Sequence, residues 1–265
     1  MTLGHVALVM PAYNEADGIE GFLAELVASF DGVADRLTIV VVDDRSTDGT
    51  ADLLEASEIQ GLVVRRQPQN GGHGPTALAA YQAGLACDAD VLVHVDGDGQ
   101  FDGYDVARVA QHLAIGVADV VHGVRRQRDD PWFRRVLSAS LRLVVAAVAR
   151  RGIRDVNTPL RAYRPDRIAE LLDSHPGELL IPHVHFSIAE ARRGWDVDEV
   201  EVRSRVRRGA TATGTMWGGT RRKHLPTRRF VAFVARAGAE FVAATVRPHR
   251  ATAPQRADQS LTETA

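Results

Sequence analysis

The stretch VLVHVDGDGQ, residues Val91–Gln100, joins an apolar run to two closely spaced acids. The run is rich in β-branched residues and is bounded by polar ones, which predicts a short buried strand. Asp96 and Asp98 follow that strand directly, with a single glycine between them. In open α/β sheets, ligands bind just beyond the carboxyl ends of the strands. We therefore expect both carboxylates to lie at a ligand-binding edge of a sheet.

Two acids spaced in this way suit a divalent cation. Carboxylate oxygens suit Mg²⁺ or Mn²⁺, and Mg²⁺ is usually held by one or two carboxylates together with substrate phosphates. An Asp-Gly turn that simply leaves a strand explains the same residues without any ligand. Asp96 and Asp98 are thus candidate metal ligands, and the segments upstream decide between the two interpretations.

Two upstream segments also place polar residues at the end of an apolar strand. VALVMPAYNE, residues 6–15, predicts a buried strand that ends at Pro11, with Asn14 as the N-cap of an amphipathic helix. LTIVVVDDRSTDGT, residues 37–50, predicts a strand that ends in acids and a helix that opens in a Ser, Thr and Asp cluster. Strands that alternate with helices in this way predict an α/β fold with a mainly parallel sheet.

The polar residues of these two segments suit a nucleotide. Asp43 can accept hydrogen bonds from a base or a ribose, and the ring of Tyr13 can stack on a base. Each segment alone is also an ordinary strand-to-helix loop. Three strand ends at one edge carry such clusters, and one of them carries the Asp-x-Asp pair. Together they predict a nucleotide-and-metal site.

These segments, with the glycine-rich turn NGGHG at residues 70–74, are similar in order and spacing to glycosyltransferase family 2. The resemblance covers roughly residues 5–210, and the nearest subgroup resembles dolichol-phosphate-mannose-synthase-like and polyprenyl-phosphate glycosyltransferases. It implies a GT-A fold, which is a mainly parallel, Rossmann-like sheet flanked by helices. It also implies inverting, metal-dependent transfer of a sugar from a nucleoside-diphosphate sugar, either a GDP- or a UDP-sugar.

The resemblance also assigns roles to residues of the first half. It implies that Asp98 binds the metal directly and that Asp96 helps through metal or ribose contacts. In the family, an arginine segment after a Glu-Val strand lies near the diphosphate, but the arginine spacing here departs from that pattern. Arg205, Arg207 and Arg208 therefore all stay candidates for binding the diphosphate. The residues implied to bind the donor nucleotide or diphosphate are Pro11, Ala12, Tyr13, Glu15, Asp43, Asp44, Gly72, Asp96, Gln100, Arg205, Arg207 and Arg208.

The second half is expected to bind the acceptor. DVNTPLRAYR, residues 155–164, is similar to a family segment that carries Gly-Phe-Arg, with Pro-Leu in place of Gly-Phe. A polyprenyl (dolichyl-type) phosphate acceptor is already anionic and needs no base from the protein. A hydroxyl acceptor needs one, and the ordinary pKa of histidine suits that role near neutral pH. Glu178, His183 and His185 are the candidate bases, and the catalytic set is these three with Asp98.

Three alternatives to a polyprenyl-phosphate glycosyltransferase are considered. A family 2 enzyme that acts on a soluble hydroxyl acceptor, such as a saccharide or a natural product, stays open. A non-catalytic relative that binds sugar nucleotides also stays open, although the chain retains Asp96 and Asp98. A nucleotidyltransferase is disfavoured, because it would carry a glycine-rich loop with Arg and Lys directly after the first strand, where this chain has Pro11 and its neighbours.

Composition limits the remaining classes. The chain has 265 residues and a net charge of −2, so it is not a nucleic-acid-binding polycation, and we expect no nucleic-acid partner. Its one cysteine, Cys87, excludes an intrachain disulfide and fits a reducing compartment. The start of the chain shows no signal-peptide pattern, and no stretch is apolar enough to span a bilayer. We expect a cytoplasmic protein, with peripheral contact at the inner face of the membrane as an option.

The predicted organisation is one catalytic domain with two appendages. The GT-A domain is expected over residues 1–229, with a donor half at about 1–125 and an acceptor half at about 126–229. An amphipathic helix is expected at 230–247 and a disordered tail at 248–265. Arginines are dense from 203 to 229, around a glycine-rich lid at 213–219. The basic run and the helix suit an anionic membrane surface, but a helix packed on the domain explains the same pattern.

Overall fold

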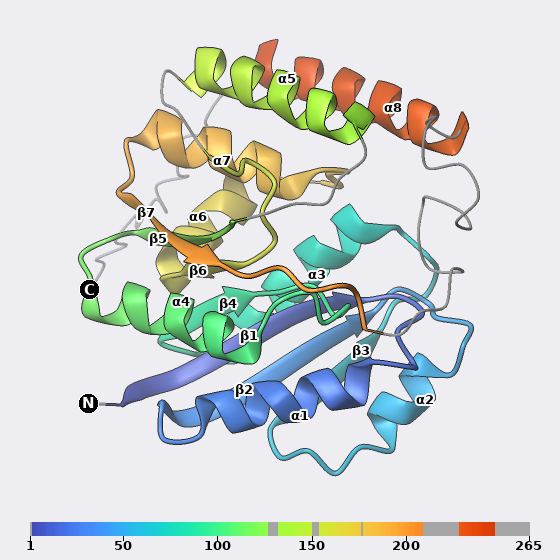
Figure 1. Cartoon of the computed structure of the whole chain (residues 1–265), viewed down its shortest axis with the longest axis vertical. Coiled ribbons are helices and arrows are strands. Elements are labelled where there is room, and N and C mark those ends of the chain that lie inside the picture. Colours follow the sequence, from blue (N-terminus) through green and yellow to red (C-terminus); the bar gives the residue numbers. More distant parts are fainter. Residues whose placement is uncertain (1, 127–131, 150–153, 176, 209–227, 247–265) are drawn as a thin grey trace, which may run out of the picture.

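The computed structural model describes residues 2–126, 132–149, 154–175, 177–208 and 228–246. Its strands and helices alternate along most of the chain, as the apolar periodicity predicts (Figure 1). The strands are β1 (Leu3–Ala12), β2 (Ala34–Asp43), β3 (Leu62–Arg66), β4 (Val91–His94), β5 (Val120–Arg125), β6 (Arg161–Tyr163) and β7 (Val197–Val202). The helices are α1 (Ile19–Phe30), α2 (Thr50–Glu55), α3 (His73–Leu85), α4 (Gly103–Ile115), α5 (Trp132–Ala149), α6 (Pro165–Ser174), α7 (Pro182–Arg193) and α8 (Arg228–Val246).

Within the described residues, the strands form one seven-stranded sheet in the order β3-β2-β1-β4-β6-β5-β7. The pairs β1–β2, β1–β4, β2–β3 and β5–β7 are parallel, and β6 is antiparallel to both of its neighbours. The prediction of an α/β fold with a mainly parallel sheet is therefore confirmed. The inner strands are buried on both faces, which explains why they read as continuous apolar runs rather than as alternating ones.

The register of the sheet brings the predicted polar clusters to one edge. Ala12 at the end of β1 pairs with Asp43 at the end of β2, and Val9 pairs with His94 at the end of β4. The loops that follow these three strands therefore leave the sheet close to one another, at the same edge. The loop after β4 is fixed to β1 because the N–H of Gly97 donates to the carbonyl of Pro11 at 3.2 Å.

Two local expectations for the first loop are wrong. Strand β1 continues through Pro11 to Ala12, which pair with Val42 and Asp43 of β2. Asn14 is not the N-cap of α1, which begins at Ile19 after Gly18. Instead Asn14 adopts a left-handed backbone with φ of 54°, and its Oδ1 accepts a hydrogen bond from Thr47 N at 2.8 Å. Asparagine tolerates this conformation better than most residues do.

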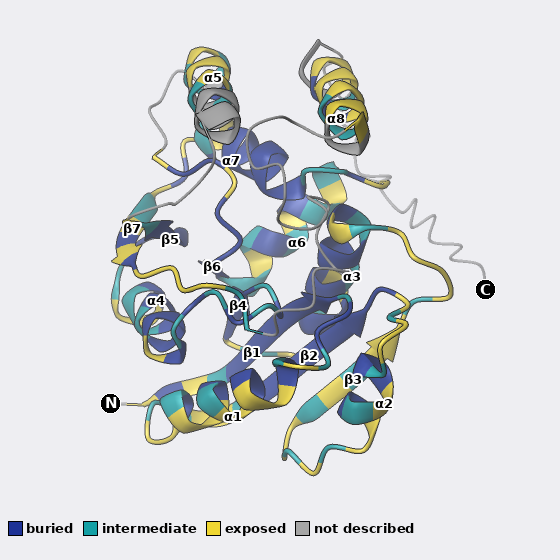
Figure 2. Cartoon of the chain, turned by 45° about the vertical axis from the view of Figure 1, so that its right-hand side comes forward, coloured by how far each residue is buried: buried dark blue, intermediate teal, exposed yellow. Residues whose placement is uncertain are grey.

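The helices cover both faces of the sheet and add an outer layer (Figures 1 and 2). One core lies between the sheet, α1 and α4, and a second lies between the sheet, α3, α6 and α7. A third, smaller cluster joins Val145 of α5, Val184 of α7 and Phe241 of α8. Helices α5 and α8 thus rest on α7 at the end of the molecule farthest from α1 (Figure 2). Among the described residues, no helix is long and apolar enough to cross a membrane.

Several expectations concern residues outside the described part of the chain. These are the lid at 213–219, the middle of the basic run at 209–227 and the tail at 248–265. The domain boundaries accordingly stay predictions.

Candidate functional site

The end of β2 carries a buried carboxylate with a free oxygen. Asp43 is fully buried, and its Oδ2 accepts from Ser46 N at 3.1 Å and lies 3.9 Å from Arg66 Nε. Its Oδ1 is buried and has no hydrogen-bond partner among the described residues. A buried carboxylate oxygen without a donor is costly, so such atoms are rare away from functional sites. Asp43 Oδ1 therefore marks a position where a ligand N–H or O–H would bind.

Asp44, the next residue, has a different environment. Its two carboxylate oxygens accept from Gly71 N at 2.7 Å and Gly72 N at 2.9 Å, and its carbonyl accepts from Asn70 Nδ2 at 2.9 Å. Asp44 thus shapes the glycine-rich turn that opens α3. Gly72 has φ of +83°, a left-handed value that favours glycine. Direct contact of Asp44 or Gly72 with a nucleotide stays a prediction.

The acidic pair after β4 lies beside this turn. Asp98 Oδ1 accepts from Gln100 N at 3.0 Å, whereas Asp96 Oδ1 is buried without a hydrogen-bond partner among the described residues. Burial, followed by the negative charge of Asp96, raises the pKa of Asp98 to about 6. His73, the first residue of α3, places Nε2 at 3.8 Å from Asp96 Oδ1. The pair is therefore a crowded, partly buried centre of negative charge that a cation would neutralise.

The donor set at this pair fits a divalent metal. Two carboxylates are enough for Mg²⁺ or Mn²⁺ when substrate phosphates and water complete the coordination. Across the described ranges, no group of three or more His, Cys, Asp or Glu side chains is arranged to hold a metal ion. A cation at Asp96 and Asp98 would therefore depend on the ligand for the rest of its coordination.

A basic strap, defined as residues Arg203–Arg208, follows β7 and runs along the acidic loop, defined as residues 95–102 between β4 and α4. Ser204 forms a β-bridge with Phe101, Arg205 N donates to Gln100 O at 2.7 Å, and Arg208 N donates to Asp98 O at 2.9 Å. Backbone hydrogen bonds thus bring the arginines to the Asp-x-Asp turn, more than 100 positions away in the chain.

The three candidate arginines of the strap have different partners. Arg207 binds both carboxylate oxygens of Glu15, with Nε at 3.2 Å from Oε2. Glu15 is buried, and this burial raises its pKa to about 7 although Arg207 opposes the shift. Arg205 and Arg208 instead pair with Glu25 on α1. Arg207 is therefore the candidate that lies beside Glu15 and close enough to Asp98 to affect its pKa.

The remaining predicted donor residues surround these groups. Ala12 is buried at the end of β1, directly before the partly exposed Tyr13, and its carbonyl accepts from Asp44 N at 2.9 Å. Pro11 contributes its carbonyl to the acidic loop, and Gln100 contributes its carbonyl to the strap. The first half of the predicted site is thus assembled at one edge of the sheet.

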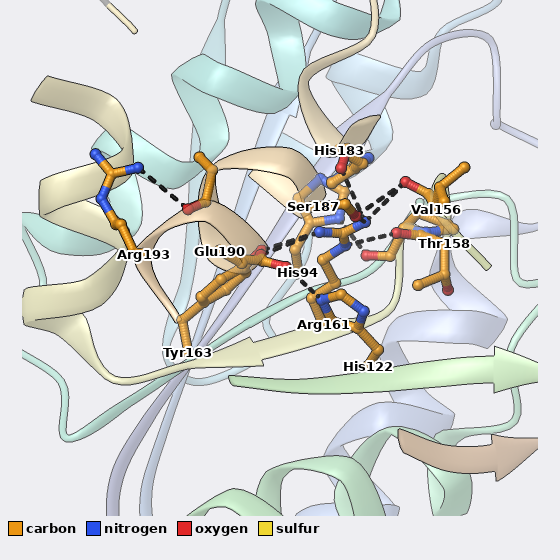
Figure 3. Close-up of polar contacts among 12 residues, drawn as sticks. His94, His122, Val156, Thr158, Arg161, Tyr163, His183, Ser187, Glu190 and Arg193 are labelled. Atoms are coloured by element: carbon orange, nitrogen blue, oxygen red, sulfur yellow. Dashed lines mark hydrogen bonds and ion pairs between the residues drawn. The ribbon is translucent and has the colours of Figure 1, made fainter. Parts of the chain in front are cut away.

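The second half contains a buried ionic network that sequence reasoning missed (Figure 3). Arg161 on β6 is fully buried, and its guanidinium donates to Glu190 Oε1 at 3.2 Å and to Ser187 Oγ at 2.8 Å, both on α7. His122 Nε2 on β5 lies 3.0 Å from Glu190 Oε2. Burial opposes ionisation of Glu190, but His122 and Arg161 together lower its pKa to about 2. The only sequence signal was the arginine of the 155–164 segment.

The three candidate bases do not come together. His183 is buried, with Nε2 at 3.2 Å from Tyr81 Oη, and burial holds its pKa well below the ordinary value. His185 places Nε2 at 3.0 Å from Glu240 Oε1 on α8. Glu178 is exposed in the segment before α7. Two of the candidates therefore already have partners within the protein.

One histidine that the sequence did not single out, His94, also lies near the acidic pair. His94, two residues before Asp96, has Nδ1 at 2.7 Å from the carbonyl oxygen of Pro159, and its ring packs 4.6 Å from that of His183. Burial lowers the pKa of His94 to about 4, so the ring is neutral and Nδ1 donates its proton to that carbonyl. Because His94 lies within an apolar run, the sequence pattern alone indicates an ordinary core residue.

Comparison with known proteins gives one family and one fold. The family model for Glycosyl transferase family 2 matches residues 7–176. Undecaprenyl-phosphate 4-deoxy-4-formamido-L-arabinose transferase of Edwardsiella ictaluri is 31% identical over 190 residues, which are 71% of this chain and 58% of that protein. The protein of the same name from Serratia proteamaculans is 30% identical over 67% of this chain and 54% of its own length. The chain therefore spans little more than half the length of these relatives.

Solved structures of low sequence identity share the fold. Glucosyl-3-phosphoglycerate synthase from Mycobacterium tuberculosis, in complex with Mn²⁺, UDP and glucosyl-3-phosphoglycerate, aligns with a TM-score of 0.64 at 20% identity. Its complex with Mn²⁺, UDP-glucose and phosphoglyceric acid aligns with a TM-score of 0.65 at 20% identity. Both alignments cover 92% of this chain and 81% of the other.

Proposed function

Because this chain belongs to glycosyl transferase family 2 and shares the GT-A fold, we propose that it transfers a sugar from a nucleoside-diphosphate sugar with inversion. One observation carries the proposal. Asp43 Oδ1 is buried without a partner in the described part of the chain, at the same edge of the sheet as Asp96 and Asp98. A nucleoside that donates to Asp43 would extend its diphosphate toward the acidic pair.

The free oxygen of Asp43 favours a uracil base. Oδ2 already accepts from Ser46 N, so one oxygen remains for the ligand. Uracil presents one N–H between two carbonyl groups, whereas guanine presents adjacent N–H groups that suit a carboxylate with both oxygens free. Tyr13, which is partly exposed beside this edge, would stack on the base. The solved neighbours in complex with UDP and UDP-glucose support the same choice of donor.

The diphosphate of the donor would lie between the acidic pair and Arg207. A divalent cation held by Asp96 and Asp98 would neutralise charge on the departing diphosphate. Arg207 would add a two-pronged contact to phosphate oxygens, because its planar guanidinium can exchange the carboxylate of Glu15 for a phosphate. Mn²⁺ in the solved neighbours supports Mn²⁺ or Mg²⁺ as the cofactor.

We infer that the acceptor is a polyprenyl phosphate. The two relatives are named as undecaprenyl-phosphate transferases, although the chain spans 58% and 54% of their lengths. A phosphate oxygen of such an acceptor would bond to the anomeric carbon as the bond to the nucleoside diphosphate breaks. No proton has to be removed from such an acceptor. This agrees with the finding that His183 and His185 already have hydrogen-bond partners within the protein.

The outer helices support peripheral contact with the inner face of a membrane. Leu143 and Val144 on α5 and Val231 and Val242 on α8 are large apolar side chains exposed to solvent. Both helices lie at the same end of the molecule (Figures 1 and 2). Apolar side chains of this kind can enter the headgroup region without a membrane-spanning segment.

A transfer assay tests this proposal. The purified protein would be incubated with a panel of UDP- and GDP-sugars, Mn²⁺ and undecaprenyl phosphate in detergent, and lipid-linked sugar would be detected by mass spectrometry. We expect a glycosyl phosphate product from at least one UDP-sugar and none when excess chelator is present. Matched reactions would contain a saccharide or phosphoglyceric acid as acceptor.

The outcomes separate the parts of the proposal. Transfer to a hydroxyl acceptor alone would overturn the lipid acceptor but leave the donor site intact. Full turnover in chelator would overturn the metal assignment. If a donor binds, as measured by calorimetry, but no acceptor in the panel is glycosylated, the chain is a non-catalytic relative and the proposed activity is wrong.

A further inference from the structure

The basic strap is held in place by a carboxylate of α1 that belongs to none of the motifs at residues 6–15, 37–50, 70–74 and 91–100. Glu25, in the middle of α1, accepts through Oε1 from Gly103 N at 2.7 Å, at the first residue of α4. The same oxygen accepts from Arg205 Nη1 at 3.0 Å. Its Oε2 lies 3.1 Å from that nitrogen and also pairs with Arg208 Nη2. One carboxylate thus joins α1, the start of α4 and two points of the strap.

The surroundings of Glu25 are built for this contact. A Cβ on Gly103 would lie 3.0 Å from Glu25 Cγ and 2.5 Å from Ser29 Oγ, so glycine permits the close approach of α4 to α1. A carboxylate at a helix N-terminus is stabilised by the exposed N–H groups and the helix dipole. Asp102, whose side chain caps α4, binds the second guanidinium nitrogen of Arg205.

Arg208 packs closely against two glycines and an aromatic ring. A Cβ on Gly18 would lie 2.7 Å from the Cβ of Arg208, and a Cβ on Gly99 would lie 2.8 Å from its Cδ. Its guanidinium carbon lies 5.9 Å from the centre of the Phe22 ring. Arg205 and Arg208 are therefore both anchored to α1 through Glu25.

Arg207 lies between these two anchors and has a separate partner. Its guanidinium binds Glu15, the buried acid beside Asp98, rather than Glu25. The backbone N–H groups of Arg205 and Arg208 donate to the carbonyls of Gln100 and Asp98. These hydrogen bonds fix the backbone on both sides of Arg207 against the acidic loop. We propose that Glu25 is a positioning residue, which holds Arg205 and Arg208 so that Arg207 meets the donor diphosphate. This inference rests on the proposed function.

Comparison of UDP with uridine isolates this role. The variant Glu25→Gln keeps an amide oxygen that can accept from Gly103 N but loses the charge that holds two arginines. In calorimetry with Mn²⁺, we expect about tenfold weaker binding of UDP, because a charge-assisted contact to the diphosphate is misplaced. Binding of uridine, which has no phosphate, should be unchanged. The control is Glu20→Gln, at an exposed position of the same helix, with both affinities unchanged.

A double-variant cycle tests whether Glu25 acts through Arg207. Arg207→Ala alone should weaken UDP binding at least as much as Glu25→Gln does. When Arg207→Ala is already present, Glu25→Gln should change UDP affinity by less than about twofold, since residues that share one route are not additive. Thermal unfolding of each variant shows whether the protein is folded at the temperature of the titration.

Each other result would overturn the inference. Unchanged UDP affinity in Glu25→Gln means that the strap does not depend on this carboxylate. Equal losses for UDP and uridine place the effect on the nucleoside or on the whole fold. Additive losses with Arg207→Ala mean that Glu25 acts by another route. If wild-type protein binds neither UDP nor inorganic pyrophosphate with Mn²⁺, the donor proposal fails and this inference falls with it.

Discussion

At the scale of single residues, the site contains two kinds of carboxylate. Asp44 and Glu25 are satisfied by N–H groups and arginines of the protein itself, so they shape the loops. Asp43 and Asp96 each keep a buried oxygen without a hydrogen-bond partner in the described residues. Because an unpaired buried oxygen is costly, it is retained where a ligand supplies the missing partner. The donor contacts predicted for Asp43, Asp44 and Asp96 stay predictions.

Removal of the charge at Asp98 should abolish metal-dependent transfer and leave the fold intact. Asp98→Asn retains an oxygen that can accept from Gln100 N, but it is a poor ligand for a divalent cation. We expect transfer to fall by more than about a hundredfold at saturating Mn²⁺, since the cation stabilises charge on the leaving diphosphate. The thermal midpoint should be unchanged or higher, because repulsion with Asp96 is relieved.

The matched control for Asp98→Asn is Asp88→Asn, in the exposed turn before β4. Asparagine tolerates the φ of 53° found there, so transfer should equal that of the wild type. Undiminished turnover by Asp98→Asn would remove this residue from the metal site.

Replacement of Asp43 should weaken the nucleoside contact. Asp43→Asn keeps an oxygen that can accept from Ser46 N but removes the charge that faces the ligand. We expect UDP and uridine to bind about tenfold to a hundredfold more weakly by calorimetry, because a hydrogen bond to a charged group contributes about 1.5–3 kcal/mol. Asp52→Asn is the control, since Asp52 also pairs with Arg66 but is exposed. Equal affinities in wild type and Asp43→Asn would exclude Asp43 from the site.

At the scale of elements, the loops after β1, β2 and β4 meet at one edge of the sheet, where the donor is proposed to bind, and the strap after β7 joins them there. The second half of the chain, which is predicted to bind the acceptor, is organised around α7, which Arg161 ties to β6 and on which α5 and α8 rest. Glu240 fixes α8 to this layer. It accepts from Leu180 N at 2.9 Å and lies 3.0 Å from His185 Nε2.

Loss of Glu240 should release α8 from α7. Glu240→Ala leaves Leu180 N and His185 without these contacts, and an unsatisfied buried donor costs about 1–3 kcal/mol. We expect faster hydrogen exchange across α8 with unchanged exchange in α1. Arg236→Ala, at an exposed position one turn earlier in the same helix, is the control. If exchange in α8 were the same in both variants, Glu240 would not be the anchor of this helix.

At the scale of the whole molecule, shifted acids and shifted histidines lie in different places. Burial raises the pKa of Glu15 and Asp98 at the donor edge to about 7 and about 6. Burial lowers the pKa of His122 and His183 inside the acceptor half. The two groups act on stability with opposite signs as the pH falls. The pH dependence of the wild type alone therefore cannot be assigned to either group, and a matched variant is needed.

The buried His122 should make the protein less stable in acid. Its pKa is lower in the folded state, so the unfolded chain binds more protons below about pH 6.5, and stability is lost as the pH falls. One such group contributes at most about 1.4 kcal/mol per pH unit. Urea unfolding of wild type and His122→Asn between about pH 7 and 5.5 should show a smaller acid loss in the variant. Parallel curves would contradict this, and the surface variant His112→Asn is the control.

The sequence by itself determined strands β1, β2 and β4, the Asp-x-Asp turn and the family, because each depends on neighbouring residues. An apolar run such as Val91–Val95 reports burial at any position in the chain, and the acids that follow it must leave the same strand end. For this reason the predicted α/β fold, its GT-A class and glycosyl transferase family 2 are confirmed. The roles of individual site residues stay predictions.

Only the tertiary structure decided which side chains meet. Arg205, Arg207 and Arg208 are equivalent in the sequence, but the strap directs one to Glu15 and two to Glu25. Such choices depend on contacts between residues about 180 or more positions apart, which no local periodicity encodes. Asn14 failed as a predicted N-cap for the same reason, since its side chain binds Thr47 in another loop. Local pattern sets what an element is, and packing sets what its side chains touch.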